Sequence, residues 1–380
     1  MIDPQSQTKM RQEINSRIEN DYELLKNLRE EIRPLKSGVR RIQPRTTTSI
    51  SLVGTDGGNN RIQFDPFLLQ LVRVVDTSNN EYCLEAVTPT TDVSCLSESQ
   101  FDEHGAAASP LGRMMEYLGT EYLWELSPMI RRNDDERPVS PSWVQVYREL
   151  VEWAILLSLV RDKDFGTDTL IIFDGLLRSK VFTGEMFADY RRGLAEAVDA
   201  QWRENRRRVY LAGVAKHSKV LSRYKLAMSL ESVLTTDYPA YVEVPPDIEE
   251  KAYVWSEYAR GDDQAAEGGE ANKFVGGKMF FVKFGPGPRD PIWPVDIFLP
   301  QARDAQQIVG YMLADAVNGF PVPFYPQCLQ KAHENAALVD FDFDILQDQV
   351  FDGLRAVLGE DAQALDTFRL QNGDVAQRRY

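Results

Sequence analysis

Thr169-Leu-Ile-Ile-Phe-Asp-Gly175 is the stretch of sequence that decides the fold. The run 169–173 is continuously apolar and has the length of one strand, so both of its faces can be buried. Such a strand belongs in the centre of a sheet. Helical patterns flank it over 141–159 and 185–208. Because strands alternate with helices, the chain is predicted to have an α/β fold.

A second stretch, Ser49-Ile-Ser-Leu-Val-Gly-Thr-Asp-Gly-Gly58, has a similar layout. Its β-branched and apolar residues predict a strand over 49–54, and the glycines and asparagines of 55–60 predict a tight turn directly after it. Two more strands are predicted over 68–76 and 81–88. We therefore expect an antiparallel meander over 49–88.

The rest of the chain continues the α/β pattern. Further helices are predicted over 8–35, 110–124, 301–318, 327–339 and 344–370, and further strands over 209–213, 278–284 and, interrupted by prolines, 290–299. The helix over 8–35 is amphipathic, and a basic segment over 40–48 follows it. Residues 256–277 are rich in Gly, Asp, Glu and Ala and are predicted to form a mobile insertion.

The composition is that of a folded, acidic protein. The 380 residues are 43% hydrophobic and carry a net charge of −15. This balance argues against a chain that coats nucleic acid non-specifically, because binding phosphates requires a cationic surface. It remains compatible with a nuclease whose positive groove is local. The longest apolar run, 153–160, is too short to cross a bilayer, and the polar N-terminus resembles no signal peptide, so we expect a cytoplasmic protein without a membrane partner.

Cysteine and histidine usage limits the possible chemistry. The three cysteines form no CxxC pair, so neither a disulfide framework nor a zinc knuckle is supported. The three histidines exclude a site built from a cluster of imidazoles. Catalysis must therefore depend on carboxylates. The glycine-rich and histidine motifs of P-loop ATPases, dinucleotide enzymes, zincins and α/β-hydrolases are also missing from the sequence.

Two carboxylates occupy equivalent positions in the predicted strands. Asp56 and Asp174 each follow a hydrophobic strand and precede glycine. If the strands are neighbours, the two side chains meet. At about 4 Å and an effective dielectric constant of 20, two such charges repel by roughly 4 kcal/mol, so the pair requires a divalent cation or a shared proton. The alternative is that each aspartate only caps a turn.

Other polar residues could complete such a site. Glu149 and Glu152 share one face of the helix over 141–159, although such residues more often belong to a solvated helix edge. Lys216 and Ser218 follow the strand over 209–213, where they could meet a phosphate. Other candidates are Asp296, between apolar neighbours, and His333, on the helix over 327–339.

Four motifs, taken in order, resemble those of the NurA nucleases. They are Val53-Gly-Thr-Asp-Gly-Gly58, Ile172-Phe-Asp-Gly-Leu176, Ala212-Gly-Val-Ala-Lys-His-Ser218 and Tyr325-Pro-Gln-Cys-Leu-Gln-Lys-Ala-His333. The resemblance covers roughly residues 45–340. It implies a ribonuclease H-like mixed sheet flanked by helices, a homodimer, and an exonuclease and endonuclease that requires manganese or magnesium. It also implies DNA as substrate and a HerA-like hexameric ATPase as partner in DNA end resection and repair.

The resemblance also implies roles for individual residues. Asp56, Asp174 and His333 match metal ligands of the family. Glu152 matches the family's metal-binding glutamate, which lies on a helix, better than Glu149 does, and Glu149 is the alternative. Together the four would hold two metal ions, with Asp56 bridging them. Catalytic Lys216 would neutralise charge on the scissile phosphate, and Tyr325 could stack on a base or fix the strand. The sequence has Phe324-Tyr-Pro where Gly-Tyr-Pro is common in the family.

The predicted organisation has three parts. Residues 1–45 form an N-terminal helix and a basic linker, 46–343 a nuclease domain that contains the insertion, and 344–380 a C-terminal helical tail. Two other functions stay open. One is a NurA-like scaffold without activity, and the other is a phosphotransferase on a related fold, although no second glycine-rich phosphate loop is evident.

Overall fold

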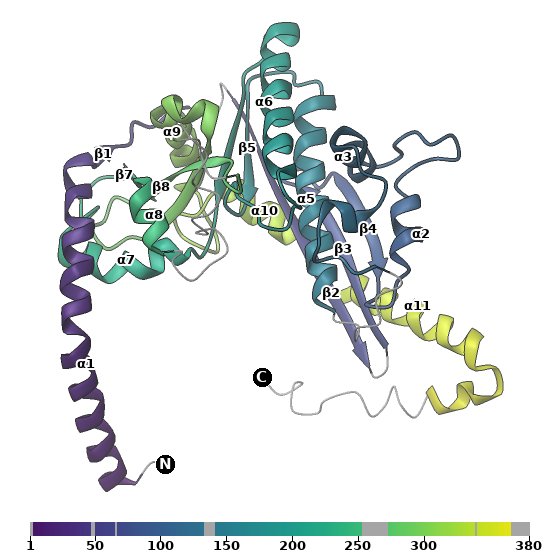
Figure 1. Ribbon diagram of the computed structural model, residues 1–380, viewed down its shortest axis with the longest axis horizontal. Coiled ribbons are helices and arrows are strands. Elements are labelled where there is room, and N and C mark those ends of the chain that lie inside the picture. The colour runs from purple at the N-terminus through teal and green to yellow at the C-terminus, as the bar shows by residue number, and fades with distance from the viewer. Residues whose placement is uncertain are drawn as a thin grey trace.

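The computed structural model describes residues 3–46, 50–64, 67–132, 141–252, 273–338 and 340–365 (Figure 1). Most of the predicted mobile insertion, 256–272, lies outside the described residues. Within them, no helix combines the length and the apolar character that crossing a membrane requires.

A mixed sheet of nine strands forms the centre of the described structure, in the order β1-β7-β8-β9-β6-β5-β2-β3-β4. The central strands β2, β5 and β6 run parallel, and the strands on either side pair antiparallel. The prediction of a mixed α/β sheet is therefore confirmed. The strands are β1 Arg40–Arg41, β2 Ser51–Phe64, β3 Phe67–Asp76, β4 Glu81–Val87, β5 Thr169–Asp174, β6 Val209–Val214, β7 Ala240–Glu243, β8 Gly277–Lys283 and β9 Ile292–Phe298.

Helices cover both faces of this sheet (Figure 1). Side chains of β5 alternate between two apolar cores: Ile171 and Phe173 pack with α5 and α6, while Leu170 and Ile172 pack with α9 and α10. The prediction that this strand is buried on both faces is confirmed. The helices are α1 Pro4–Ile32, α2 Val93–Glu98, α3 Pro110–Leu118, α4 Leu123–Leu126, α5 Ser142–Asp162, α6 Met186–Asn205, α7 Lys219–Leu230, α8 Pro246–Ala252, α9 Ala305–Ala316, α10 Gln327–Ala336 and α11 Asp340–Leu358.

Two helical predictions differ from the structure in detail. The predicted helix over 110–124 is divided into α3 and α4, because Gly119 adopts a left-handed conformation with φ of 70° and ends α3. The predicted helix over 301–318 begins with a 3-10 segment, Leu299–Asp304, before α9. Neither difference moves a candidate site residue.

The predicted turn over 55–60 is wrong. Strand β2 continues through these residues to Phe64, and Thr55 to Phe64 pair with β3. The glycines serve close packing instead of chain reversal. A Cβ on Gly57 would overlap the Glu152 carboxylate of α5, and one on Gly58 would overlap the Ala336 carbonyl of α10. Asp56 therefore lies inside a long strand that is closely packed on both faces.

Candidate metal centre

Asp56 and Asp174 are brought together by strand pairing. Strands β2 and β5 are parallel neighbours with Thr55 opposite Phe173, so the next residue on each strand is an aspartate. Asp174 ends β5, and Gly175 follows it with a φ of 141°, a conformation that residues with a Cβ rarely adopt. This register explains why the two carboxylates lie side by side on neighbouring central strands.

His333 completes a group of three potential ligands. It lies in the second half of α10, and its Nδ1 is 2.6 Å from Asp56 Oδ2. One ligand atom from each of Asp56, Asp174 and His333 lies within 4.8 Å of the others. Helix α10 can approach β2 because position 54 is glycine, where a Cβ would collide with the Cys328 carbonyl. The imidazole is 62% exposed, so the cluster is open to solvent on that side.

The electrostatics of the cluster show an excess of negative charge. Burial raises the pKa of Asp56, the charge of Asp174 raises it further, and the hydrogen bond from His333 partly offsets both. Asp174 accepts a hydrogen bond from Lys216 Nζ at 3.2 Å and one from the Tyr325 hydroxyl at 3.0 Å. Both aspartates are therefore fixed in place by their partners.

Glu152 on α5 adds a third carboxylate. Its side chain is 14% exposed, and burial raises its pKa to about 8, partly offset by Arg148 and reinforced by the charge of Asp56. Arg148 Nε lies 3.4 Å from Glu152 Oε1, and Arg148 Nη1 donates to the Gly57 carbonyl at 3.1 Å. Arg148 was not among the predicted site residues, although its spacing of four residues from Glu152 could have indicated it.

Glu149 is engaged elsewhere. Its carboxylate accepts a hydrogen bond from Ser179 Oγ at 2.6 Å and one from Trp153 Nε1 at 3.5 Å. The charges of Asp56 and Asp174 both raise the pKa of Glu152, which places its carboxylate close to theirs. The structure therefore favours Glu152 over Glu149 as the carboxylate beside the cluster.

Two predicted substrate contacts have other roles. Tyr325 is only 1% exposed and packs edge-on against Trp293, so its ring is not open for stacking on a base in this structure. Burial and the charge of Asp174 instead raise the pKa of Tyr325, which keeps its hydroxyl a donor. Ser218 caps α7: its hydroxyl accepts from the Leu221 amide at 3.4 Å and is largely buried, so it is not positioned as a free phosphate ligand.

Lys216 and Asp296 have contrasting environments. The Lys216 side chain is 42% exposed, and its ammonium also lies over the Tyr325 ring at 5.7 Å. Asp296 is fully buried on β9 and accepts two hydrogen bonds from Arg178, at 2.8 and 2.7 Å. Asp296 is therefore the acidic half of a structural ion pair, whereas Lys216 faces solvent beside the cluster.

The donor set suits a divalent cation. Oxygen donors with one imidazole nitrogen are ligands that Mn²⁺ accepts, and carboxylates suit Mg²⁺ as well. Burial raises the pKa of Asp56 and of Glu152, and the cationic groups beside them, His333 and Arg148, only partly offset it. A cation would supply the remaining positive charge.

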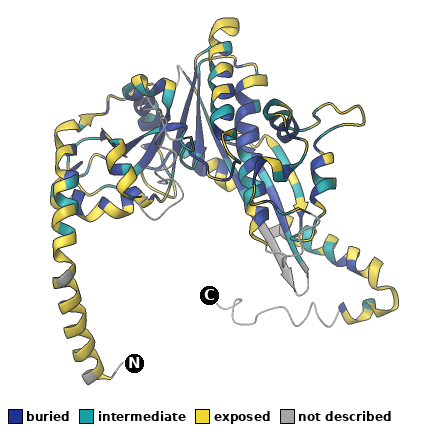
Figure 2. Ribbon diagram, in the orientation of Figure 1, coloured by how far each residue is buried: buried dark blue, intermediate teal, exposed yellow. Residues whose placement is uncertain are grey.

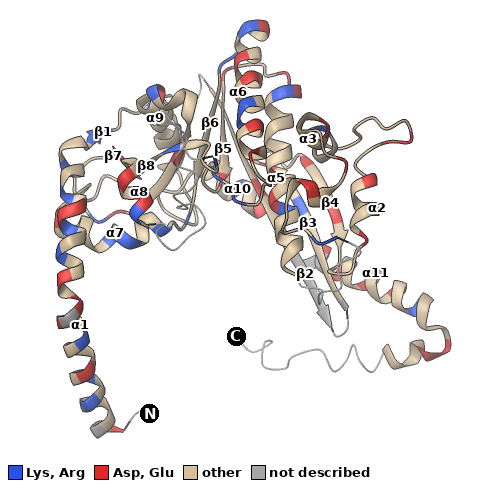
Figure 3. Ribbon diagram, in the orientation of Figure 1, with Lys and Arg blue, Asp and Glu red and all other residues tan. Residues whose placement is uncertain are grey.

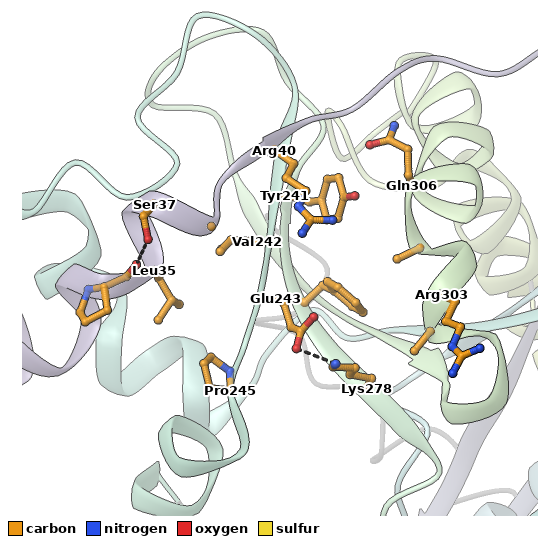
Figure 4. Close-up of a pocket in the computed structure, with 15 residues that line it drawn as sticks. Leu35, Ser37, Arg40, Tyr241, Val242, Glu243, Pro245, Lys278, Arg303 and Gln306 are labelled. Atoms are coloured by element: carbon orange, nitrogen blue, oxygen red, sulfur yellow. Dashed lines mark hydrogen bonds and ion pairs between the residues drawn. The ribbon is translucent and has the colours of Figure 1, made fainter.

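A cavity of about 470 Å³ lies elsewhere, between β7, β8 and the 3-10 helices Arg33–Gly38 and Leu299–Asp304 (Figure 4). Its lining includes Arg40, Tyr241 and Arg303, and Lys278 is paired with Glu243 at 2.6 Å. None of the residues that line it belongs to the cluster of Asp56, Asp174 and His333. The candidate metal centre is therefore an open site beside the central strands β2 and β5, separate from this cavity.

The structure of this chain is similar to those of NurA nucleases. The NurA nuclease from Sulfolobus solfataricus aligns over 93% of this chain and 98% of its own, with 11% identity and a TM-score of 0.45. A further crystal structure of NurA aligns over 90% of this chain and 98% of its own, with 13% identity and a TM-score of 0.42. A crystal structure of NurA with manganese aligns over 92% of this chain and 98% of its own, with 11% identity and a TM-score of 0.39. No protein-family model matches the chain, and no curated protein matches its sequence.

Tyr325→Phe tests how the site holds Asp174. We expect this variant to fold normally but to bind Mn²⁺ about 10- to 100-fold more weakly, because Asp174 loses the hydroxyl donor that orients it. Isothermal titration calorimetry measures the affinity. Tyr190→Phe is the matched control, since it removes a buried hydroxyl that donates to the Trp153 carbonyl instead. Equal Mn²⁺ affinity for wild type and Tyr325→Phe would contradict the positioning role.

Proposed function

We propose that this chain is a metal-dependent DNA nuclease of the NurA kind, with a ribonuclease H-like fold. The observation that supports this most strongly is the convergence of Asp56, Asp174 and His333 within 4.8 Å, with Glu152 beside them. Three of the four motifs that resemble NurA nucleases contain Asp56, Asp174 and His333, and the motifs also favour DNA as the substrate. In this proposal residues 46–343 form the nuclease domain, which 1–45 and 344–380 flank.

The ligand set would hold Mn²⁺ or Mg²⁺, and a pair of such ions would activate water and stabilise the leaving oxygen of a phosphodiester. The protein's own part is positioning. Asp56 and Asp174 are fixed by strand register, and Lys216 and Tyr325 set the orientation of the Asp174 carboxylate. Lys216 is exposed enough to face an incoming phosphate, whose charge it would partly neutralise.

The proposed enzyme acts in an assembly. The motifs that support a NurA-like nuclease also favour a homodimer that works with a HerA-like hexameric ATPase in DNA end processing. The sequence has no P-loop motif, so directional movement along DNA would have to come from such a partner.

A cleavage assay tests the proposed activity. The purified chain is incubated with linear plasmid and with single-stranded oligonucleotides, in Mn²⁺, in Mg²⁺ and in a chelator. We expect degradation with the cations and none with the chelator. A chain that binds Mn²⁺ but leaves every substrate intact would favour the inactive scaffold, and nucleotide binding without cleavage would favour a phosphotransferase.

Lys216→Ala tests the proposed phosphate contact. We expect turnover to fall by roughly 100-fold, because the phosphate loses a cation that stabilises developing charge. Folding should be unaffected, since the side chain is exposed. Lys225→Ala, an exposed lysine on α7, is the control. Single-strand degradation at the wild-type rate by Lys216→Ala would refute its role at the phosphate.

A further inference from the structure

Helix α1 extends well beyond the body of the protein (Figure 1). Its last turns are anchored, because Leu28 and Ile32 pack into the apolar cluster that contains Tyr224 and Met228 of α7. Arg29 and Arg33 both pair with Glu231, at 2.6 and 2.8 Å, and fix the same end. The first five turns are largely exposed (Figure 2). Within the described residues, the contacts between α1 and the body therefore lie at the C-terminal end of the helix.

The free part of α1 carries an apolar stripe. Met10, Ile14, Ile18 and Tyr22 recur every four residues, and they are 43%, 47%, 62% and 48% exposed. The stripe runs on into the face of Leu25, Leu28 and Ile32, part of which is buried against the body. Four large apolar side chains in a row on one exposed helix face indicate an interaction surface.

The charges along α1 are distributed unevenly (Figure 3). The half nearer the N-terminus contains Lys9, Arg11 and Arg17 with the single acid Glu13, whereas the following turns contain Glu19, Asp21 and Glu23. A helix with a basic half and an acidic half is complementary to a second copy of itself, provided that the two copies run antiparallel.

We propose that α1 pairs antiparallel with α1 of a second copy of this chain, about a two-fold axis at the level of residue 16. In this register Ile14 of one copy lies opposite Ile18 of the other, and Met10 lies opposite Tyr22. The paired segment from residue 10 to residue 22 is about 18 Å long at 1.5 Å per residue. Every apolar contact occurs twice, as the two-fold symmetry of a homodimer requires.

The same register pairs opposite charges beside the stripe. Arg11 lies level with Asp21 of the other copy, and Lys9 lies level with Glu23, which Lys26 of its own helix also contacts at 2.5 Å. One like-charged pair, Glu13 with Glu19, occurs near the axis. A parallel pairing would instead align Arg11 with Arg11 and Asp21 with Asp21. Charge complementarity therefore favours a second copy in the antiparallel direction.

This pairing supplies an interface for the homodimer of the proposed function. The inference rests on the proposed homodimer and is independent of the nuclease chemistry. The test is sedimentation equilibrium on the full chain without metal or DNA. We expect twice the chain mass of 43.3 kDa at micromolar concentration. The Asp56→Asn chain should show the same mass, so a failed interface and a failed nuclease are distinguishable.

Substitutions in the stripe test the surface itself. The double variant Ile14→Lys/Ile18→Lys should weaken dimerisation by roughly 100-fold or more, because it places four lysines in the seam. Leu84→Lys is the matched control: Leu84 lies on β4 and is 50% exposed, close to the 47% of Ile14. A wild-type chain that stays monomeric, or a double-lysine variant that dimerises as tightly as wild type, overturns the proposal.

Charge reversal tests the direction and register. Arg11→Glu should weaken dimerisation roughly tenfold, since it creates two like-charged pairs. The double variant Arg11→Glu/Asp21→Lys should dimerise with the wild-type affinity, because opposite charges face each other again. Failure of the double variant to restore affinity would overturn the antiparallel register.

Discussion

Asp56→Asn is expected to abolish DNA cleavage while leaving the fold intact. The substitution removes a carboxylate ligand, so the loss of activity should exceed the roughly 10- to 100-fold that loss of an outer partner costs. Folding should not suffer in the absence of a cation. Burial and the charge of Asp174 raise the pKa of Asp56, so an ionised Asp56 destabilises the folded, cation-free protein. The neutral amide removes that repulsion.

Three measurements separate these effects. Cleavage of linear plasmid in Mn²⁺ gives the activity, calorimetry gives the Mn²⁺ affinity, and urea unfolding in a chelator gives the free energy of unfolding. Asp189→Asn is the control, because Asp189 is an exposed carboxylate on α6 that pairs with Arg192. Mn²⁺-dependent cleavage by Asp56→Asn at more than a few per cent of the wild-type rate would refute the ligand assignment.

Glu152→Gln is expected to weaken cation binding and to remove much of the protein's loss of stability with rising pH. Burial raises the pKa of Glu152 from 4.5 to about 8. Between these values the unfolded chain has lost the proton and the folded chain still holds it. The free energy of unfolding of the cation-free protein therefore falls by a few kcal/mol in total as pH rises from about 4.5 to 8. Below and above this range Glu152 adds no pH dependence to the free energy of unfolding.

The variant should lose most of that slope and, at pH 8, be more stable than the cation-free wild type. A weaker slope of the same sign should remain, because the pKa of Asp56 is also raised. Urea unfolding at several pH values between 5 and 8, with a chelator present, measures the effect. Glu116→Gln, an exposed glutamate on α3, is the control. An unchanged slope in Glu152→Gln would show that Glu152 is ionised in the folded protein throughout this range.

Cation binding should show the converse pH dependence in wild type. A cation binds the ionised carboxylates, so it must displace the protons that Glu152 and Asp56 retain, and Mn²⁺ affinity should rise with pH up to about 8. Glu152→Gln should flatten this rise as well. The two experiments therefore connect the buried carboxylate to the metal centre by independent readouts.

Much of the fold could be predicted from local sequence patterns. The apolar run before Asp174 predicted a buried central strand, and the structure places β5 between β2 and β6. The glycines after Asp56 misled the interpretation because a glycine that permits a turn and one that permits close packing look identical in sequence. Only the positions of α5 and α10 on either side of β2 show that Gly57 and Gly58 belong to the second kind.

The candidate site was less accessible to sequence reasoning. Equivalent positions on two apolar strands were enough to expect Asp56 and Asp174 to meet. His333 lies 277 residues from Asp56, and no periodicity connects them, so only its place in a motif indicated that it belongs there. Burial decided the roles of Tyr325 and Ser218, and burial depends on tertiary packing that their local sequence does not encode.

Anomalous diffraction from crystals soaked in Mn²⁺ tests the metal centre most directly. Data collected at the manganese absorption edge should show a peak within coordinating distance of Asp56, Asp174 and His333, and the same soak of Asp56→Asn crystals should show a much weaker one. A wild-type map with no manganese peak at these residues, or with Asp56 and Asp174 turned toward different neighbours, would contradict the account.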